Sequence, residues 1–131
     1  MSELPPQSQV ARLMDGYVTT QLLYVAAKLG VADVLADGAR TAAEIAEAVG
    51  ADAALLGRAL RGLVLEDVLS EEDGHFALTP LCVWLREGVP GSLRGPIMVR
   101  GDVYYGAAAG LLATVVDGGV AFEHVHGERF F

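Results

Sequence analysis

Residues 41–65, TAAEIAEAVGADAALLGRALRGLVL, carry the signals that decide the expected fold. Thr41 with Glu44 three positions later is a capping box that starts a helix, and Gly50 ends that helix. Asp52 then caps a second helix, in which apolar residues recur with a period of 3.6. Because only a tight turn separates the two segments, the stretch predicts a helix-turn-helix.

The segment after this pair changes to β character. Short apolar runs at about 67–70 and 75–78 flank a charged tip, Glu71-Glu72-Asp73-Gly74. An Asp-Gly pair between apolar runs is typical of a β-hairpin turn. Two helices followed by a hairpin predict a mainly α, winged-helix-like domain, with the hairpin at about 67–78 as its wing.

Upstream of this motif, residues 8–29 have the spacing of one long helix. Its apolar positions lie three and four apart, at Val10, Leu13, Met14, Tyr17, Val18, Leu22, Val25 and Leu29. Such a helix would span roughly 30 Å and is apolar on more than one side. We expect Gly30 to end it, a short helix to follow at 31–35, and the long helix to cross into a second subunit.

Downstream of the hairpin, further helices are expected over about 80–117. Their predicted starts are Thr79-Pro80, Ser92 and Asp102. The last and longest should run over 103–116 and end at Gly118-Gly119. Gly106 and Gly110 lie inside it, and a glycine costs a helix about 1 kcal/mol relative to alanine. A specific neighbour should therefore pack there, either a helix of another subunit or a ligand-pocket wall.

Length and composition favour one domain that needs a partner. The chain has 131 residues, of which 53% are apolar and 16 more are glycines. A domain this small buries only about two-thirds of the surface that its unfolded chain exposes. The apolar surplus therefore predicts exposed patches, as in an obligate oligomer or a protein that lacks a companion domain.

The charge and the cysteine content exclude several classes. A formal net charge of −8 disfavours nucleic acid, because phosphate backbones attract basic surfaces. Cys82 is the single cysteine, so no intrachain disulfide or cysteine-rich zinc site is expected. The longest uncharged stretch, 103–116, is too short to span a membrane, and residues 1–9 do not have the pattern of a signal peptide. We expect a cytoplasmic protein that contacts no membrane.

Candidate chemical groups are few. The second helix of the pair offers only Arg58 and Arg61 to DNA, and the acidic wing would repel it. A weakly spaced metal-site candidate consists of Glu123, His124, His126 and Glu128, but no metal is expected. His75 and Cys82 lack a matching base and oxyanion donor, and Cys82 is expected to be buried. Neither a G-x-G-x-x-G nor a Walker loop is present, so no cofactor-binding residue is assigned.

Seven short runs, taken in order, resemble the N-terminal dimerisation domain of S-adenosylmethionine-dependent O-methyltransferases. The similarity is to the bacterial branch that acts on polyketides and other aromatic natural products, and it covers essentially the whole chain. The runs are GYV (16–18), LGVAD (29–33), TAAEIA (41–46), RALRGL (58–63), FALTP (76–80), PGSLR (90–94) and FEHVHG (122–127).

This resemblance implies an intertwined homodimer in which residues 1–131 form a dimerisation and substrate-lid domain. The implied parent would methylate a hydroxyl of an aromatic acceptor, with S-adenosylmethionine as donor. In the family, the Rossmann-like donor domain and the general base follow this region. They would be supplied in cis or in trans, so no catalytic residue is assigned, and the parent could also use the donor for other chemistry.

The resemblance also suggests which side chains meet the partner or the acceptor. At the subunit contact and pocket rim we expect Met14, Tyr17 and Val18. Facing the aromatic acceptor we expect Tyr104, Tyr105, Ala108 and Phe122. At helical spacing, each of these residues could instead belong to a plain core. Two departures from the family pattern are LEDVL at 65–69, in place of a small-Gly turn, and the small residues at 106–110, which suggest a roomier pocket.

One alternative from a different functional class remains open at this point. A stand-alone dimeric winged-helix protein could bind a hydrophobic small molecule or regulate transcription. The helix-turn-helix and the apolar surplus support this alternative, whereas the acidic charge counts against it.

Overall fold

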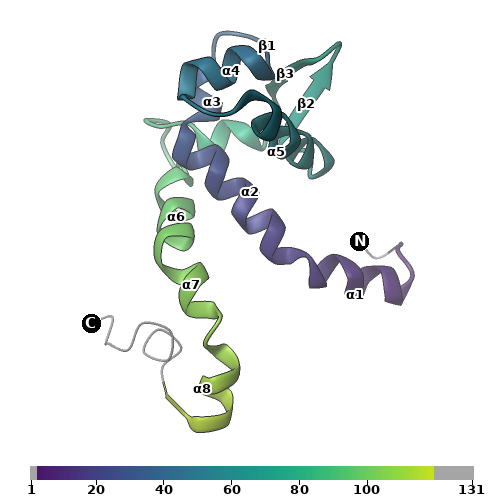
Figure 1. Ribbon diagram of the computed structural model, residues 1–131, viewed down its shortest axis with the longest axis vertical. Helices are drawn as coiled ribbons and strands as arrows, with labels where there is room; N and C mark the ends of the chain where they lie inside the picture. The colour runs from purple at the N-terminus through teal and green to yellow at the C-terminus, as the bar shows by residue number, and fades with distance from the viewer. Residues whose placement is uncertain (1–2, 120–131) are drawn as a thin grey trace. The chain divides into compact units, whose positions relative to one another are not determined.

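A computed structural model describes residues 3–119 and shows a mainly helical chain with one small antiparallel sheet (Figure 1). This confirms the predicted fold class. The chain divides into two compact units, residues 1–94 and 95–131. Within residues 3–119, no helix is long and apolar enough to span a bilayer.

The N-terminal segment is two helices, so the prediction of a single helix over 8–29 is wrong. Helix α1 (Pro6–Met14) and helix α2 (Gly16–Leu29) meet at Asp15, whose φ and ψ of −96° and 11° leave the α-helical range. Aspartate and glycine are both weak helix formers, and here they are adjacent. The Val18 N–H donates to the Asp15 carbonyl at 2.9 Å, so helix α2 begins directly after the break.

The end of α2 follows the sequence signals. Gly30 caps the helix with φ of +74°, a left-handed conformation that glycine adopts without steric cost. The short helix α3 (Val31–Val34) then begins at once, as predicted.

The predicted helix pair is confirmed as α4 (Ala42–Val49) and α5 (Ala53–Leu65). At the start of α4, the Glu44 N–H donates to Thr41 Oγ1 at 3.2 Å and the Thr41 N–H donates to Glu44 Oε1 at 2.9 Å. Gly50 ends α4 with φ of +74°. Asp52 Oδ2 accepts the Leu55 N–H at 2.8 Å and caps α5.

The hairpin is also present, but it belongs to a three-stranded sheet. Strands β1 (Arg40–Thr41), β2 (Leu69–Glu72) and β3 (His75–Leu78) lie in the order β1-β3-β2, all antiparallel. The turn consists of two residues, Asp73 and Gly74, with φ of +52° and +78°. The predicted four-residue tip is therefore wrong, because Glu71 and Glu72 pair with β3. Strand β1 was not predicted, since two residues carry no readable alternation.

The core of the first unit lies where α2, α3, α4 and α5 meet the sheet. Its fully buried side chains are Phe76, Ile45, Leu60, Leu63, Leu69, Val31 and Cys82. Helices α2 and α5 approach closely, because a Cβ placed on Gly62 would lie 2.8 Å from Leu22 Cδ1. A side chain at position 62 would thus require Leu22 to move.

The segment after β3 does not form the predicted α-helix. It forms one turn of 3-10 helix, η1 (Cys82–Leu85). Thr79 Oγ1 donates to the carbonyls of Asp67 and Val68, at 2.8 Å each, and so ties the segment to the start of the wing instead of capping a helix.

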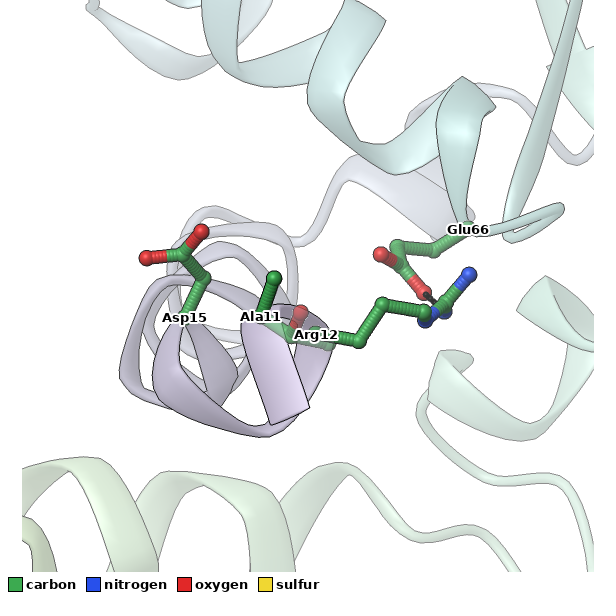
Figure 2. Close-up of a pocket in the computed structure, with 5 residues that line it drawn as sticks. Ala11, Arg12, Asp15 and Glu66 are labelled. Atoms are coloured by element: carbon green, nitrogen blue, oxygen red, sulfur yellow. Dashed lines mark hydrogen bonds and ion pairs between the residues drawn. The ribbon is translucent and has the colours of Figure 1, made fainter. Parts of the chain in front are cut away.

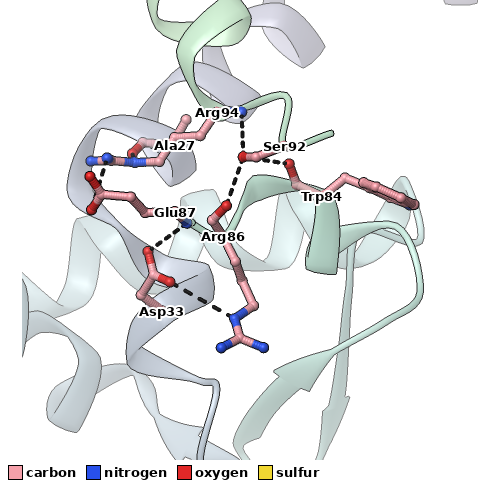
Figure 3. A network of polar contacts seen from close by, with 7 residues as sticks. All are labelled: Ala27, Asp33, Trp84, Arg86, Glu87, Ser92 and Arg94. Atoms are coloured by element: carbon pink, nitrogen blue, oxygen red, sulfur yellow. Dashed lines mark hydrogen bonds and ion pairs between the residues drawn. The ribbon is translucent and has the colours of Figure 1, made fainter. Parts of the chain in front are cut away.

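A polar network fixes the chain where it leaves the first unit (Figure 3). Arg94 Nε donates to the Ala27 carbonyl at 2.7 Å, near the end of α2. The Glu87 N–H donates to Asp33 Oδ2 at 3.2 Å. Ser92 Oγ accepts the Arg94 N–H at 3.2 Å, close to the predicted helix start. Helix α6 (Arg94–Val99) begins from this anchored point.

In the second unit, the predicted helix over 103–116 is broken. A π-helical segment, η2 (Arg100–Tyr104), passes into α7 (Tyr105–Ala108), and α8 (Leu111–Asp117) follows. Asp102 lies inside η2, so its predicted role as a helix cap is wrong. The break falls at Gly110, the N-cap of α8, and Gly118 ends α8 with φ of +81° as predicted.

Candidate functional site

Helices α1 and α2 present an exposed apolar surface, which we call the N-terminal stripe. Three members lie three and four residues apart on one side of α1, and the other two lie in the first turn of α2, directly after the break at Asp15. The five members are Val10, Leu13, Met14, Tyr17 and Val18, with exposed fractions from 41% to 73%. Three predicted contact residues, Met14, Tyr17 and Val18, therefore face solvent in the single chain and do not belong to its core.

A hollow lies between α2 and α5, which we call the α2–α5 groove. Its volume is about 340 Å³, and its lining is almost wholly apolar: Val25, Leu29, Ala51, Asp52, Leu55, Leu56 and Ala59. The one carboxylate of this lining, that of Asp52, accepts the Leu55 N–H at the start of its own helix. Leu55 is one of the periodic apolar residues of α5, and 62% of it is exposed at this groove.

A polar pocket of about 300 Å³ lies where α1 joins α2 (Figure 2). Arg12 Nη2 and Glu66 Oε2 form an ion pair at 3.2 Å, which links α1 to the end of α5. Both side chains are partly exposed, and pairs of this kind contribute about 0.2–1 kcal/mol. The pair therefore orients α1 and adds little to the stability of the fold.

The second unit carries the predicted acceptor residues on one helical segment. Tyr104 ends the π-helix η2, Tyr105 begins α7, and Ala108 ends α7. All three are exposed. A π-helical turn inside a helix is rare and frequently marks a functional site. Phe122, the fourth predicted acceptor residue, lies outside the described residues.

Helix α8 adds a further exposed apolar set in the second unit. It consists of Leu111, Leu112, Val115 and Val116. These positions pair at spacings of four residues, which places them together on the helix surface.

The described residues offer little catalytic chemistry of their own. Cys82 is buried as predicted, and its burial raises the pKa of the thiol to about 11, so the reactive thiolate is disfavoured. His75 lies at the hairpin tip, with Nδ1 3.0 Å from the Asp73 carbonyl oxygen. Within residues 3–119, no group of three or more His, Cys, Asp or Glu side chains could hold a metal ion. The weak metal candidate at 123–128 lies outside that range.

The charged side chains of the helix pair and hairpin lie as the sequence predicted. Arg58 and Arg61 are exposed on α5, and Glu71, Glu72 and Asp73 are exposed on the hairpin.

Comparison with known proteins identifies the family. The sequence model described as "O-methyltransferase dimerisation domain" matches residues 11–88, more than half of the chain. The chain belongs to this family. The matched range contains Leu13, Met14, Tyr17 and Val18 of the N-terminal stripe, and all of the α2–α5 groove.

The curated relatives that match the chain are bacterial methyltransferases. Phenazine O-methyltransferase PhzM of Lysobacter antibioticus is 42% identical over 129 residues, which are 98% of this chain and 38% of that protein. The crystal structure of LaPhzM superimposes with a TM-score of 0.92 at 42% identity, over 98% of this chain and 39% of that one. For CalO1, a methyltransferase of calicheamicin biosynthesis in its SAH-bound form, the TM-score is 0.81 at 34% identity, over 97% and 39%. The chain thus spans about two-fifths of the length of its relatives.

The sequence analysis did not predict two features of the candidate site, the Arg12–Glu66 ion pair and the α2–α5 groove. The Arg12–Glu66 pair joins residues 54 positions apart, and neither residue belongs to a local motif. The α2–α5 groove has no clear sequence signal, because Leu55 and Leu56 are adjacent apolar residues and adjacent helical positions can both be buried, as Ile45 and Ala46 are. Its depth depends on how α2 packs on α5, which periodicity does not specify.

Proposed function

We propose that residues 1–131 form the dimerisation and acceptor-side lid domain of a methyltransferase, and that catalysis is carried out elsewhere in the protein. The family match supports the dimerising role, and the exposed N-terminal stripe supplies a surface for it. In this interpretation α4, α5 and the hairpin act as a winged-helix scaffold without a DNA-reading role. The alternative of a stand-alone regulator is not favoured by the family match.

The observation that carries the proposal is the N-terminal stripe itself. Five large apolar side chains within nine consecutive residues of α1 and α2 are exposed, and soluble monomers seldom gather such side chains away from an interaction site. A second protomer would remove this surface from water.

Sedimentation equilibrium of the 131-residue chain tests this role. We expect a dimer for the parent chain and a shift toward monomer for Leu13→Asp, because a carboxylate buried in an apolar contact lacks a partner. Leu81→Asp is the matched control: Leu81 is also about half exposed but lies outside the stripe. A parent chain that stays monomeric at all concentrations would overturn the proposal.

For the whole protein, we propose transfer of a methyl group from S-adenosylmethionine to a hydroxyl of an aromatic acceptor. The names of the similar proteins support this chemistry: one methylates a phenazine, and another was solved with the demethylated donor. The donor-binding domain would be contributed by further sequence in cis or by a second polypeptide. Isothermal titration of the 131-residue chain with S-adenosylmethionine should give no binding heat, and measurable binding would contradict this division of labour.

We further propose that Tyr104, Tyr105, Ala108 and Phe122 contact the aromatic acceptor, with Met14, Tyr17 and Val18 at the pocket rim. The exposure of the tyrosines beside a π-helical segment supports this assignment. In an enzyme that contains this segment, Tyr105→Ala should raise KM for the acceptor, while Tyr105→Phe, which keeps the ring, should change it less. A cytoplasmic location stays a prediction that rests on the single cysteine.

A further inference from the structure

Arg94 ties the start of α6 to the end of α2 (Figure 3). Its Nε atom donates a hydrogen bond of 2.7 Å to the carbonyl of Ala27, three residues before Gly30 ends the helix. The last carbonyls of a helix lack partners further along it and carry a partial negative charge, so a guanidinium is favourable there. Ala27 is fully buried, and 23% of the Arg94 side chain is exposed. The bond is therefore largely shielded from water, where a charge-assisted hydrogen bond is strongest.

The other contacts of Arg94 hold its backbone and steady its side chain. Ser92 Oγ accepts the Arg94 N–H at 3.2 Å and itself donates to the Arg86 carbonyl at 2.7 Å. Arg94 Nη1 lies 3.6 Å from Glu87 Oε2, but the Glu87 side chain is 78% exposed, and exposed ion pairs contribute little. The bond to Ala27 is thus the main anchor of this side chain. Arg94 is the last residue of the first unit, so all of these contacts lie within that unit.

Arg94 is also the first residue of a continuous helical stretch, residues 94–108, which we call the acceptor segment. Helix α6 passes into η2 and then into α7 with no non-helical residue between them. At the junctions, Val99 has φ and ψ of −62° and −41°, and Tyr105 has −59° and −46°. The ten residues from Arg94 to Tyr104 rise about 15 Å. A tilt at Arg94 is therefore carried along the segment to Tyr104 and Tyr105.

Packing offers little support to the base of the acceptor segment. Of the described residues 94–104, which make up α6 and η2, none is buried. Short helices that bury no side chain are marginal in water. A polar anchor at the first residue of the segment therefore has a large influence on its order.

We infer that Arg94 is a positioning residue for the aromatic acceptor. Through its hydrogen bond to Ala27 it holds the base of the acceptor segment, and the segment in turn carries Tyr104, Tyr105 and Ala108. Arg94 acts through these residues and not by contact with the acceptor. Arginine suits this role, because its guanidinium is always charged and its planar donors lose little entropy for each hydrogen bond that they form. This inference rests on the proposed function and specifies what holds its acceptor residues in place.

Amide hydrogen exchange of the full 131-residue chain tests whether Arg94 orders the segment. Arg94→Met keeps an apolar stem and removes every donor of the guanidinium. We expect exchange over residues 97–108 to become about tenfold faster, the size expected for the loss of one hydrogen bond from a charged group. Exchange in α5 should stay within about twofold of the parent's, since local and global opening are separate events. Arg94→Lys retains a charged donor and should restore part of the difference.

Arg58→Met is the matched control, because Arg58 is exposed on α5 and its substitution removes the same charge. It should leave exchange over residues 97–108 within about twofold of the parent's. Equal rates over this range for the parent and Arg94→Met, whether fast or slow, would overturn the inference. Acceleration of the same size throughout α5 would also overturn it, since Arg94 would then serve only the stability of the first unit.

Steady-state kinetics of the methyltransferase that contains residues 1–131 gives a second measurement. The acceptors are a panel of hydroxylated aromatic compounds that includes a hydroxyphenazine. Arg94→Met should raise KM for the acceptor about tenfold and leave KM for S-adenosylmethionine within about twofold of the parent's. A merely structural role would lower the amount of active enzyme, and so kcat, without separating the two KM values.

The outcomes of the kinetic measurement separate this inference from the proposed function. An unchanged KM for the acceptor would overturn the positioning role and leave the proposed function intact. A parent enzyme that methylates no member of the panel would contradict the proposed function, and the exchange rates would still decide whether Arg94 orders the acceptor segment.

Discussion

The N-terminal arm, α1 and α2 up to Val18, and the helix α5 carry the same periodic apolar pattern with opposite results. In α5, Leu56, Leu60 and Leu63 are buried against the rest of the first unit. In the arm, residues at the same spacing are exposed, and every residue of α1 in the described chain is exposed or half-buried. A period of 3.6 thus specifies which side chains share a face and leaves open whether that face is covered by the same chain or by another.

The two regions also differ in how their helices begin. Helices α4 and α5 have side-chain caps at Thr41 and Asp52. Among the residues that the structure describes, neither α1 nor α2 has a side-chain cap at its N-terminus. Short helices without such support are marginal in water and depend on packing. The arm therefore relies on its contacts more than α4 and α5 do, which agrees with a surface completed by a partner.

The largest expected effect on the free energy of unfolding comes from a substitution at the centre of the core. Phe76→Ala deletes a ring that is 1% exposed and should lower the free energy of unfolding by about 3–5 kcal/mol. Chemical denaturation followed by circular dichroism measures this loss, with Phe76→Leu as a control that retains apolar volume. A loss below about 1 kcal/mol would mean that the sheet does not pack on the helices as described.

A matched pair of leucines tests the comparison directly. Leu60→Ala in α5 should cost about 2–5 kcal/mol of unfolding free energy, whereas Leu13→Ala in α1 should stay within about 0.5 kcal/mol of the parent. Both are measured at protein concentrations where the chain is monomeric, because association adds stability that depends on concentration. Equal losses for the two variants would contradict the distinction between arm and core.

A smaller effect is expected from the cap of α4. Thr41→Ala removes the hydroxyl that accepts the Glu44 N–H and should lower the free energy of unfolding by about 1 kcal/mol. Thr41→Ser retains the hydroxyl and should restore most of the loss. If Thr41→Ala proved neutral, the capping box would not contribute to the stability of this region.

The smallest expected effect is on how the free energy of unfolding changes at acidic pH. Hydrogen bonds from the Thr41 backbone N–H and side-chain hydroxyl lower the pKa of Glu44 below its ordinary 4.5. The resulting stabilisation is present above the unfolded-state pKa and is lost as the pH falls through the lower folded-state pKa. The advantage of the parent over Glu44→Gln should therefore shrink below about pH 4.5 in denaturation series. Glu47→Gln controls for the loss of one negative charge from the same helix, and a gap that widens in acid would contradict the assignment.

Local signals predicted much of the first unit. The capping box at Thr41, the cap at Asp52 and the stops at Gly30 and Gly50 act within a few residues, so the sequence contains all the atoms involved. The turn at Asp73-Gly74 was predicted from the same kind of local signal. Its flanking strands extend closer to the turn than expected.

The errors fall where a local signal competes with a distant partner. Thr79 looks like a helix cap, but its hydroxyl donates to Asp67 and Val68, which the sequence places twelve and eleven residues away. Asp102 also looks like a cap, yet it lies within a continuous helical segment. At Asp15 the local signal was overlooked. The helical spacing of apolar residues predicted one continuous helix, although Asp15 and Gly16 are adjacent weak helix formers and the helix breaks there.

The sequence by itself determined the family, the helix pair with its caps, the hairpin, and which apolar side chains share a face of α1 and α2. The family resemblance rests on short runs spread over residues 16–127, and each of the other features depends on residues that are near one another in the chain. Only the tertiary structure decided that Arg12 pairs with Glu66 and that α2 and α5 leave a groove between them. These features depend on the distance between segments far apart in sequence, which is set by the packing of Leu22 on Gly62 and not by any local pattern.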